Sequence, residues 1–225
     1  MTAPLWFIAV LAAYGLADIL FVRSGRKPWL HPVILPAAAG ITVIAYFDLP
    51  FAVFEQGTHI FHLLLMAAVA ALALPLYRNF AAVRKDPAAV IAAIVGGSLA
   101  GGGSAVTAAV MLNAPAALSA SLASKSVTTP IAILVTEQMG GIPSIAAAVV
   151  IVTGLVVAVI GPRVLHLFGI DGDITVGLAM GTAGHGLGMA EAVRRSDLMG
   201  AAAAFAMASN GLVTAVVLPL FWRLI

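Results

Sequence analysis

The sequence contains one residue that is out of place in an apolar chain and suited to bind an anion. Lys125 lies within the segment Ser124–Pro130, between two long apolar stretches. An ammonium near the middle of a bilayer costs roughly 2.5 to 3.5 kcal/mol even on a lenient insertion scale. Pro130 lacks an N–H and frees the carbonyl near position 126, which predicts a break in the helix. We predict a polar, anion-binding site formed by Lys125, Ser126, Thr128 and Thr129.

Two structural alternatives for Lys125 remain open. The lysine could form a buried ion pair with Glu137 or Glu191. Residues 114–124 could instead form a short surface helix that leaves Lys125 in a loop.

Two glycine-rich segments, 96–107 and 181–193, lie within apolar stretches. Each glycine costs a helix roughly 1 kcal/mol relative to alanine. Paired interruptions in a membrane protein point to a transport site, where a free helix N-terminus attracts an anion. We predict broken helices at both places; the alternative is close helix packing through small residues. The candidate contacts are Gly102, Gly103, Ser104, Gly184 and Gly186.

Three further polar residues complete the candidate site. His185, inside the second glycine segment, could bind a carboxylate, carry a proton or bond to a neighbouring carbonyl. Asn210 could donate to a substrate or tie helices together, and we favour the first role. Glu191 could couple transport to protons.

The composition excludes a cytosolic enzyme, a nucleic-acid binder and a disordered chain. The 225 residues are 62% apolar and only 9% charged, whereas soluble domains carry about 25% charge. We expect an all-α polytopic protein of the cell (plasma or inner) membrane. The chain has no cysteine, and no His, Asp and Glu trio or nucleophile elbow has suitable spacing. We expect no metal, no cofactor and no enzymatic activity.

About eight spans separate the charged loops, and spans four, five and seven could be broken or re-entrant. The predicted spans are 4–22, 30–47, 59–77, 88–112, 115–138, 142–161, 173–193 and 198–222. Applied to this order, the positive-inside rule places both termini outside. The predicted cytoplasmic basic residues are Arg23, Arg26, Lys27, Arg78, Arg84, Lys85, Arg194 and Arg195, whereas Arg163 and Arg223 fall outside.

A shift of 85 residues pairs Arg78 with Arg163 and aligns the two glycine segments. An odd number of crossings separates the paired positions, so the repeat would be inverted, as in many secondary transporters. We therefore divide the single membrane domain, 1–225, into accessory spans (1–57), a first repeat of spans three to five (58–140) and a second repeat of spans six to eight (141–225).

Three stretches resemble the LrgB/CidB antiholin-like family over essentially the whole chain, most densely over 96–220. They are NAPAALSASLASKSVTTPIAILVTEQMGGIPSIAA, GTAGHGLGMAEAV and the last span, which ends in LPLF. The resemblance implies two different activities. Bacterial members modulate murein hydrolase activity and autolysis with a small holin-like LrgA/CidA partner. A plastid relative, in which both modules are fused, translocates glycolate and glycerate, and some bacterial pairs resemble it in moving pyruvate or similar small carboxylates.

We therefore carry two main hypotheses forward. The first is a secondary carrier of small monocarboxylates such as glycolate, glycerate, lactate or pyruvate, because a midplane lysine and paired glycine breaks have no evident use in a packing protein. The alternative is an antiholin-like regulator that acts through the LrgA/CidA-type partner. An intramembrane enzyme is the least favoured. We expect a homo-oligomer, in the simplest case a dimer.

Overall fold

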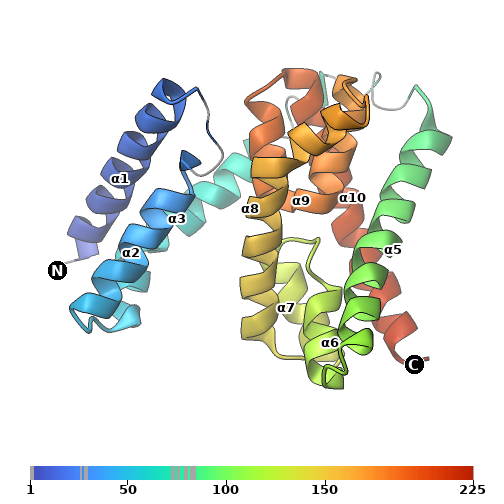
Figure 1. Ribbon diagram of the computed structural model, residues 1–225, viewed down its shortest axis with the longest axis horizontal. Coiled ribbons are helices and arrows are strands. Elements are labelled where there is room, and N and C mark those ends of the chain that lie inside the picture. Colours follow the sequence, from blue (N-terminus) through green and yellow to red (C-terminus); the bar gives the residue numbers. More distant parts are fainter. Residues whose placement is uncertain are drawn as a thin grey trace. The chain divides into compact units, whose positions relative to one another are not determined.

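The computed structural model describes residues 3–25, 27, 30–71, 74, 77–78, 81 and 85–224. Arg26 and Arg84, which the predicted topology uses, and part of the predicted third span lie outside these residues. The elements in the described part are helices (Figure 1), and the chain forms two compact units, 1–71 and 72–225. Four of the helices are long and apolar enough to cross a membrane: Leu5–Arg23, Pro87–Met111, Pro143–Leu167 and Asp197–Trp222.

The first unit contains α1 (Ala3–Arg23), α2 (Ile34–Tyr46) and α3 (Phe51–Ala71). Aromatic side chains join α1 to α3: the ring centroids of Trp6 and Phe54 lie 5.1 Å apart, and those of Phe7 and Phe61 lie 5.0 Å apart. The predicted accessory region ended at residue 57, but α3 crosses that boundary and lies within the first unit.

Three long helices form the frame of the second unit: α5 (Pro87–Met111), α8 (Pro143–Leu167) and α10 (Asp197–Trp222). At 1.5 Å per residue, each is long enough to cross the hydrocarbon core, about 30 Å thick. Helices α5 and α8 have 25 residues each and begin with proline, whose fixed φ suits a first turn. Figure 1 shows the shorter helices at opposite ends of this frame, α6 and α7 at one and α9 at the other.

Helices α6 (Ala116–Ala123) and α7 (Thr129–Gln138) form a hairpin that enters the frame and turns back. Ile142 N–H, beyond the end of α7, donates to Ser121 Oγ in α6 at 2.7 Å. Nearer the turn, the hydroxyls of Ser124 and Thr136 lie 2.9 Å apart. With 8 and 10 residues, neither helix can cross a membrane, which takes about 20 residues.

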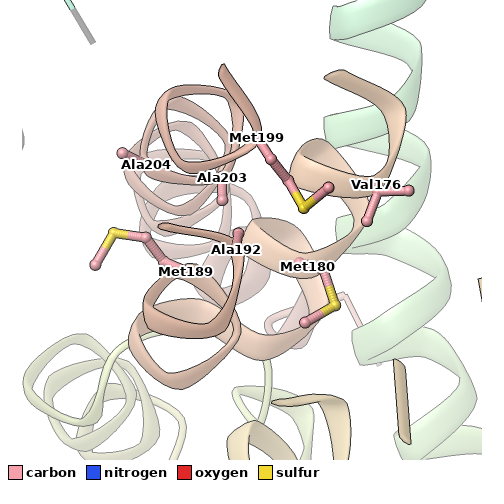
Figure 2. Close-up of a cluster of buried hydrophobic side chains, with 7 residues drawn as sticks. All are labelled: Val176, Met180, Met189, Ala192, Met199, Ala203 and Ala204. Carbon is pink, nitrogen blue, oxygen red and sulfur yellow. The ribbon is translucent and has the colours of Figure 1, made fainter. Parts of the chain in front are cut away.

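Helix α9 (Asp173–Val193) is a second hairpin with a sharper turn. The helical dihedrals are broken only at His185, with φ 39° and ψ −126°. The two ends meet, because Ser196, just beyond α9, donates its hydroxyl to the Asp173 carboxylate at 2.5 Å. Figure 2 shows side chains from both legs of α9 packed with the first half of α10 in one cluster: Val176, Met180, Met189, Ala192, Met199, Ala203 and Ala204.

These two hairpins correct the predicted spans. The predicted crossings at 115–138 and 173–193 are re-entrant hairpins, so the prediction of breaks there is confirmed and that of crossings is wrong. The predicted break at 96–107 is also wrong, since α5 is an uninterrupted helix through all of these residues. Neighbouring elements hold the glycines in a helix that their intrinsic propensity alone disfavours.

The internal repetition has a different register from the predicted one. The 85-residue shift aligns the straight helix α5 with the hairpin α9, so that register is wrong. A shift of 56 residues aligns Pro87 with Pro143 at two helix starts, and Asn113 (φ 54°) with Gly169 (φ 70°) two residues beyond the helix ends. A hairpin follows each time, so the repeated unit visible in the element order is one long helix and one hairpin.

The two long helices of this unit run in opposite directions. Val90, near the start of α5, packs with Leu178 of α9, whereas Ala146, near the start of α8, packs with Ala132 of α7. Helix α5 therefore begins at the α9 end of the frame, and α8 begins at the α6/α7 end. The hairpins accordingly enter from opposite ends.

The α9 end of the second unit carries most of its described basic residues. Because α9 turns back, the end of α8, both ends of α9 and the starts of α5 and α10 all lie there. This end has Lys85, Arg163, Arg194 and Arg195, whereas Arg223 follows α10 at the opposite end. The prediction that separated Arg163 from Arg194 and Arg195 across the membrane is wrong, because it counted α9 as a crossing.

Candidate functional site

One asparagine joins the tips of the two hairpins at the middle of the frame. Asn210, near the midpoint of α10, is 1% exposed. Its Nδ2 donates to the carbonyl of Ser126 at 2.6 Å and to that of Thr182 at 3.0 Å. Its Oδ1 accepts from the hydroxyls of Ser98 in α5 and, at 3.4 Å, Thr214. Two carbonyls can only accept, so the amide nitrogen must face them.

Both carbonyls lack their normal helical donor, and the sequence explains why. The carbonyl of residue i in a helix accepts from the N–H of residue i+4. Ser126 lies outside any helix, in the turn before α7, and the residue four positions on is Pro130, which has no N–H. For Thr182 it is Gly186, which lies beyond the break at His185. Asn210 therefore donates to one carbonyl at the turn of each hairpin, and its own hydrogen-bonding groups are occupied within the protein.

Lys125 lies in the turn between α6 and α7 and has no acidic partner in the described part of the chain. Its ammonium contacts Ser126 Oγ at 3.3 Å. Glu191 pairs instead with Arg195, at 2.9 Å, and Glu137 is exposed. The predicted alternative of a short helix followed by a loop is correct in its secondary structure. The helix is not a surface helix, however, since Ser119, Ala120 and Ser121 are buried.

The hydroxyls beside Lys125 differ in what they bind. Ser124 is fully buried and bonded to Thr136. Thr128 caps α7 without a side-chain hydrogen bond, and Thr129 begins the helix. Both threonines are half-buried, and neither hydroxyl has a hydrogen-bond partner among the described residues. The N-terminus of α7 therefore presents two free hydroxyls next to an ammonium.

His185 fixes the tip of α9 to α8. Its Nε2 lies 2.9 Å from the carbonyl oxygen of Val150, so Nε2 carries the hydrogen and donates it. Gly154 leaves the space for the ring, because a Cβ there would lie 2.5 Å from His185 Cε1. Of the roles predicted for His185, the bond to a carbonyl is the one present in this structure.

Some of the candidate glycines lie where a neighbouring element packs closely against them, and others have open space around them. On α5, a Cβ at Gly101 would lie 3.1 Å from Ser126 Oγ, and one at Gly102 would lie 3.1 Å from the Ala123 carbonyl oxygen. Gly103 has nothing within 4 Å, and Ser104 is exposed. The structure therefore places Gly102 against the α6/α7 hairpin, but brings neither Gly103 nor Ser104 into the site.

The glycines of α9 serve its packing. A Cβ at Gly184 would lie 2.6 Å from Val157 of α8, and a Cβ at Gly188 would meet the Met180 carbonyl on the other leg. Gly186, the first residue after the kink, has open space around it. Close packing through small residues, the predicted alternative, thus describes most of this segment.

Sequence reasoning missed Gly97, Ser98 and Thr182. A Cβ at Gly97 would lie 2.9 Å from Thr182 Cγ2, so this glycine admits the tip of α9. Thr182 is 5% exposed, and its hydroxyl has no hydrogen-bond partner in the described part of the chain. The spacing of Gly97 and Gly101, one helical turn apart on the side that meets both tips, was the available signal.

The arrangement presents donors and positive charge where the two hairpins meet. The N-terminus of α7 and that of the second leg of α9, from Gly186, both begin at the tips. Helix N-termini carry free N–H groups and a partial positive charge. With the Lys125 ammonium and the unpaired hydroxyls of Thr128, Thr129 and Thr182, the tips have the groups that a small carboxylate would bind. Within the described residues, no three His, Asp or Glu are placed to hold a metal ion.

Comparison with known proteins agrees with the resemblance seen in the sequence. The profile of the LrgB-like family matches residues 10–224. Proteins named antiholin-like protein LrgB from Bacillus mycoides (strain KBAB4), Bacillus cereus (strain B4264) and Bacillus anthracis (strain CDC 684 / NRRL 3495) are each 31% identical over 221 residues. The alignments cover 98% of this chain and 96% of each relative. No solved structure matches the chain. The chain is a multi-pass membrane protein and belongs to the LrgB-like family.

Proposed function

We propose that this protein is an antiholin-like membrane protein whose molecular activity is the passage of a small monocarboxylate anion, such as glycolate, glycerate, lactate or pyruvate. The names of its relatives support the antiholin-like role, which was the alternative hypothesis, more directly than they support transport. The carrier activity rests on the geometry of the second unit. The proposal includes no enzymatic step and no cofactor.

The observation that carries the transport proposal is the meeting of two oppositely oriented re-entrant hairpins within the frame of three long helices, where Asn210 of α10 bonds to both tips. The tip of α9 contacts Val150 in the first half of α8, and the tip of α6/α7 contacts Asn210 near the middle of α10. Non-helical backbone at this depth is tolerated in a membrane only inside protein or beside a wet cavity. Inverted elements with broken helices at the midplane are typical of secondary transporters.

In this proposal, each group at the tips has a defined task. The Lys125 ammonium neutralises the carboxylate, and the N-terminus of α7 adds its N–H groups and the hydroxyls of Thr128 and Thr129. Thr182 offers a hydroxyl from the other hairpin. Ser126, which accepts from Lys125, and His185, which holds the α9 tip to α8, position these groups. Gly102, Gly184 and Gly186 act through the backbone, by close packing or open space.

The basic α9 end of the second unit is proposed to face the cytoplasm. The three long helices of this unit then place the C-terminus on the outer side. Hairpin α9 reaches the site from the cytoplasm, and hairpin α6/α7 reaches it from outside. Access alternates when one hairpin moves while the other stays closed.

The regulator role is proposed through a separate partner. A holin-like LrgA/CidA-type protein, and a second copy of this chain, are the expected associates in the membrane. Movement of an acid across the membrane would alter the pH near the cell wall, so transport and an effect on autolysis are compatible.

Uptake into liposomes tests the carrier activity. Purified protein is reconstituted alone and given radiolabelled glycolate, lactate or pyruvate, with Lys125→Met as the matched inactive variant. Saturable uptake that exceeds that of empty liposomes and of the variant is expected. Absence of uptake of all three acids, with and without the LrgA-like partner, would contradict transport and leave the regulator role.

An autolysis assay separates the two roles. If the effect on autolysis follows from transport, Lys125→Met lowers both together. A variant that still modulates murein hydrolase activity while uptake is lost would show that the regulator role does not depend on transport.

A further inference from the structure

The side-chain amide of Asn210 donates its two hydrogen atoms to two different hairpins. Asn210 Nδ2 donates to Ser126 of α6/α7 at 2.6 Å and to Thr182 of α9 at 3.0 Å. No other side chain in the described part of the chain bonds to both tips. The tips are therefore coupled through a single group on a third element, α10.

Each of these bonds satisfies a carbonyl at a hairpin turn: Ser126 lies between α6 and α7, and Thr182 lies three residues before the kink at His185. Both carbonyls lie in a buried region, since Ser126 is 8% exposed and Thr182 is 5% exposed. A hairpin that moves away from Asn210 leaves a buried acceptor without a partner unless water or substrate reaches it. The closed position of each hairpin is thus favoured by the same side chain.

The oxygen of the amide is held in place from the opposite side. The single hydroxyl hydrogen of Ser98 in α5 is shared between Oδ1 and the Ile94 carbonyl, 2.6 Å away, and Thr214 lies one turn further along α10 at 3.4 Å. Because Oδ1 is anchored, the NH2 group cannot rotate toward one tip without losing the bonds on the other side. The direction of the amide is set by α5 and α10, the elements of the frame.

We propose that Asn210 is a positioning residue that acts as a latch: it keeps both hairpins closed, and a hairpin opens only when its carbonyl leaves this amide. The inference rests on the proposed function in that it assumes hairpins that move. It assigns Asn210 to the control of access rather than to contact with the substrate, which was the favoured role in the sequence analysis.

The natural absence of cysteine makes the latch testable by labelling of single cysteines. Gly186→Cys reports the tip of α9, where a Cβ meets nothing within 4 Å, and Thr128→Cys reports the tip of α6/α7. Each reporter is combined with native Asn210 or with Asn210→Asp. The aspartate keeps the size of the side chain and replaces the donating nitrogen by an oxygen. A membrane-impermeant maleimide is added to both faces of the liposomes.

We expect Asn210→Asp to raise the labelling rate of both tip cysteines by about tenfold or more, as expected when a hydrogen bond to a buried acceptor is lost. Thr214→Val is the matched control, because it alters the same network without touching a tip, and it should leave both rates within about twofold of native. Ala201→Cys, at a fully buried position of α10, must stay protected, which excludes general loosening. Exposed Lys85→Cys must label rapidly throughout.

Unchanged labelling of both tips in Asn210→Asp would overturn the latch. If this variant does not fold, Asn210→Ser takes its place. One hydroxyl can donate to at most one carbonyl, so at least one tip should then label faster, and native labelling rates at both tips would also overturn the latch. Uptake measured in matched liposomes that hold the native protein separates the two proposals. If Asn210→Asp speeds labelling of the tips but the native protein takes up no acid, the result contradicts transport alone. If the native protein takes up an acid but Asn210→Asp leaves labelling unchanged, the result contradicts the latch alone.

Discussion

The two hairpins of the second unit reach the same depth but are built differently. Hairpin α6/α7 turns through a loop of residues 124–128 that contains Lys125. Hairpin α9 turns at one residue, His185, with a positive φ. The first tip carries formal charge and free hydroxyls, whereas the second is shaped by glycines and fixed by a side-chain bond to α8.

This difference indicates that chemistry and architecture are divided between the hairpins. Both legs of α9 are closely packed, and a Cβ at Gly177 or Gly181 would overlap the backbone of α10. In the proposed carrier, hairpin α6/α7 contributes the charge and most of the hydroxyls that would recognise an anion. Substitutions at the first tip should therefore change transport more than stability, and substitutions along α9 should change stability first.

Loss of the charge at the first tip should have the largest effect. Lys125→Met should reduce uptake by about 10- to 100-fold, the effect of removing a hydrogen bond to a charged group. The unfolding midpoint should stay the same or rise, because an ammonium near the midplane is costly. Lys125→Arg should retain part of the uptake. Uptake assays and thermal unfolding measure both effects, and a variant that loses stability together with uptake would break the division between the hairpins.

A methyl group in the α9–α10 contact should act on stability. A Cβ at Gly181 would overlap the carbonyl of Ala203 and lie 2.8 Å from its Cα. Because backbone atoms cannot move aside cheaply, Gly181→Ala should destabilise the protein by about 3 kcal/mol. Gly103→Ala is the matched control on α5, with nothing within 4 Å, and should gain about 0.5 to 1 kcal/mol. Equal stability of the two variants in thermal unfolding would contradict the packing described for α9.

The sequence predicted the class of protein and the position of the unusual backbone better than the path of the chain. The composition indicated a helical membrane protein, and Lys125 with Pro130 correctly marked a break. Apolar length alone cannot distinguish a crossing from a hairpin of equal length, which is why 115–138 and 173–193 were counted as spans. That error also produced the wrong repeat register and the wrong side for Arg163.

The sequence also could not show which residues contact one another in the folded protein. Glycine content predicted a break in α5, but the tips of two hairpins seat against Gly97 and Gly101 and the helix continues. The polarity of Asn210 indicated importance, but only the structure shows that both its donors are occupied by backbone carbonyls. Thr182 could not be predicted, because nothing in its sequence context shows that its hydroxyl is buried and has no partner in the described part of the chain.

The strained turn of α9 offers a test of whether His185 serves the backbone or the ligand. A non-glycine residue at this φ is strained by about 1 to 3 kcal/mol. His185→Ala keeps the strain and loses the bond to Val150, whereas His185→Gly loses the bond but relieves the strain. We expect the glycine variant to be more stable than the alanine variant by about 1 kcal/mol. The opposite order in denaturant unfolding would show that the turn relaxes without the ring.

The smallest expected effect concerns one hydroxyl on each hairpin. Thr136 of α7 is bonded to Ser124, whereas Thr182 of α9 has no partner among the described residues. Thr136→Val should destabilise the protein by about 1 kcal/mol, because it leaves the Ser124 hydroxyl buried and unpaired. Thr182→Val should stabilise it by a similar amount, since it removes a buried group that makes no bond.

A buried hydroxyl without a hydrogen-bond partner lowers the stability of the protein. In the proposed carrier, the Thr182 hydroxyl has a function because it bonds to the substrate. We therefore expect Thr182→Val to raise the KM for the transported acid several-fold, by about the factor that one hydrogen bond gives, while the protein becomes more stable. A Thr182→Val variant with unchanged KM would remove this residue from the site and confine substrate recognition to the charged hairpin, which would sharpen the division between the two.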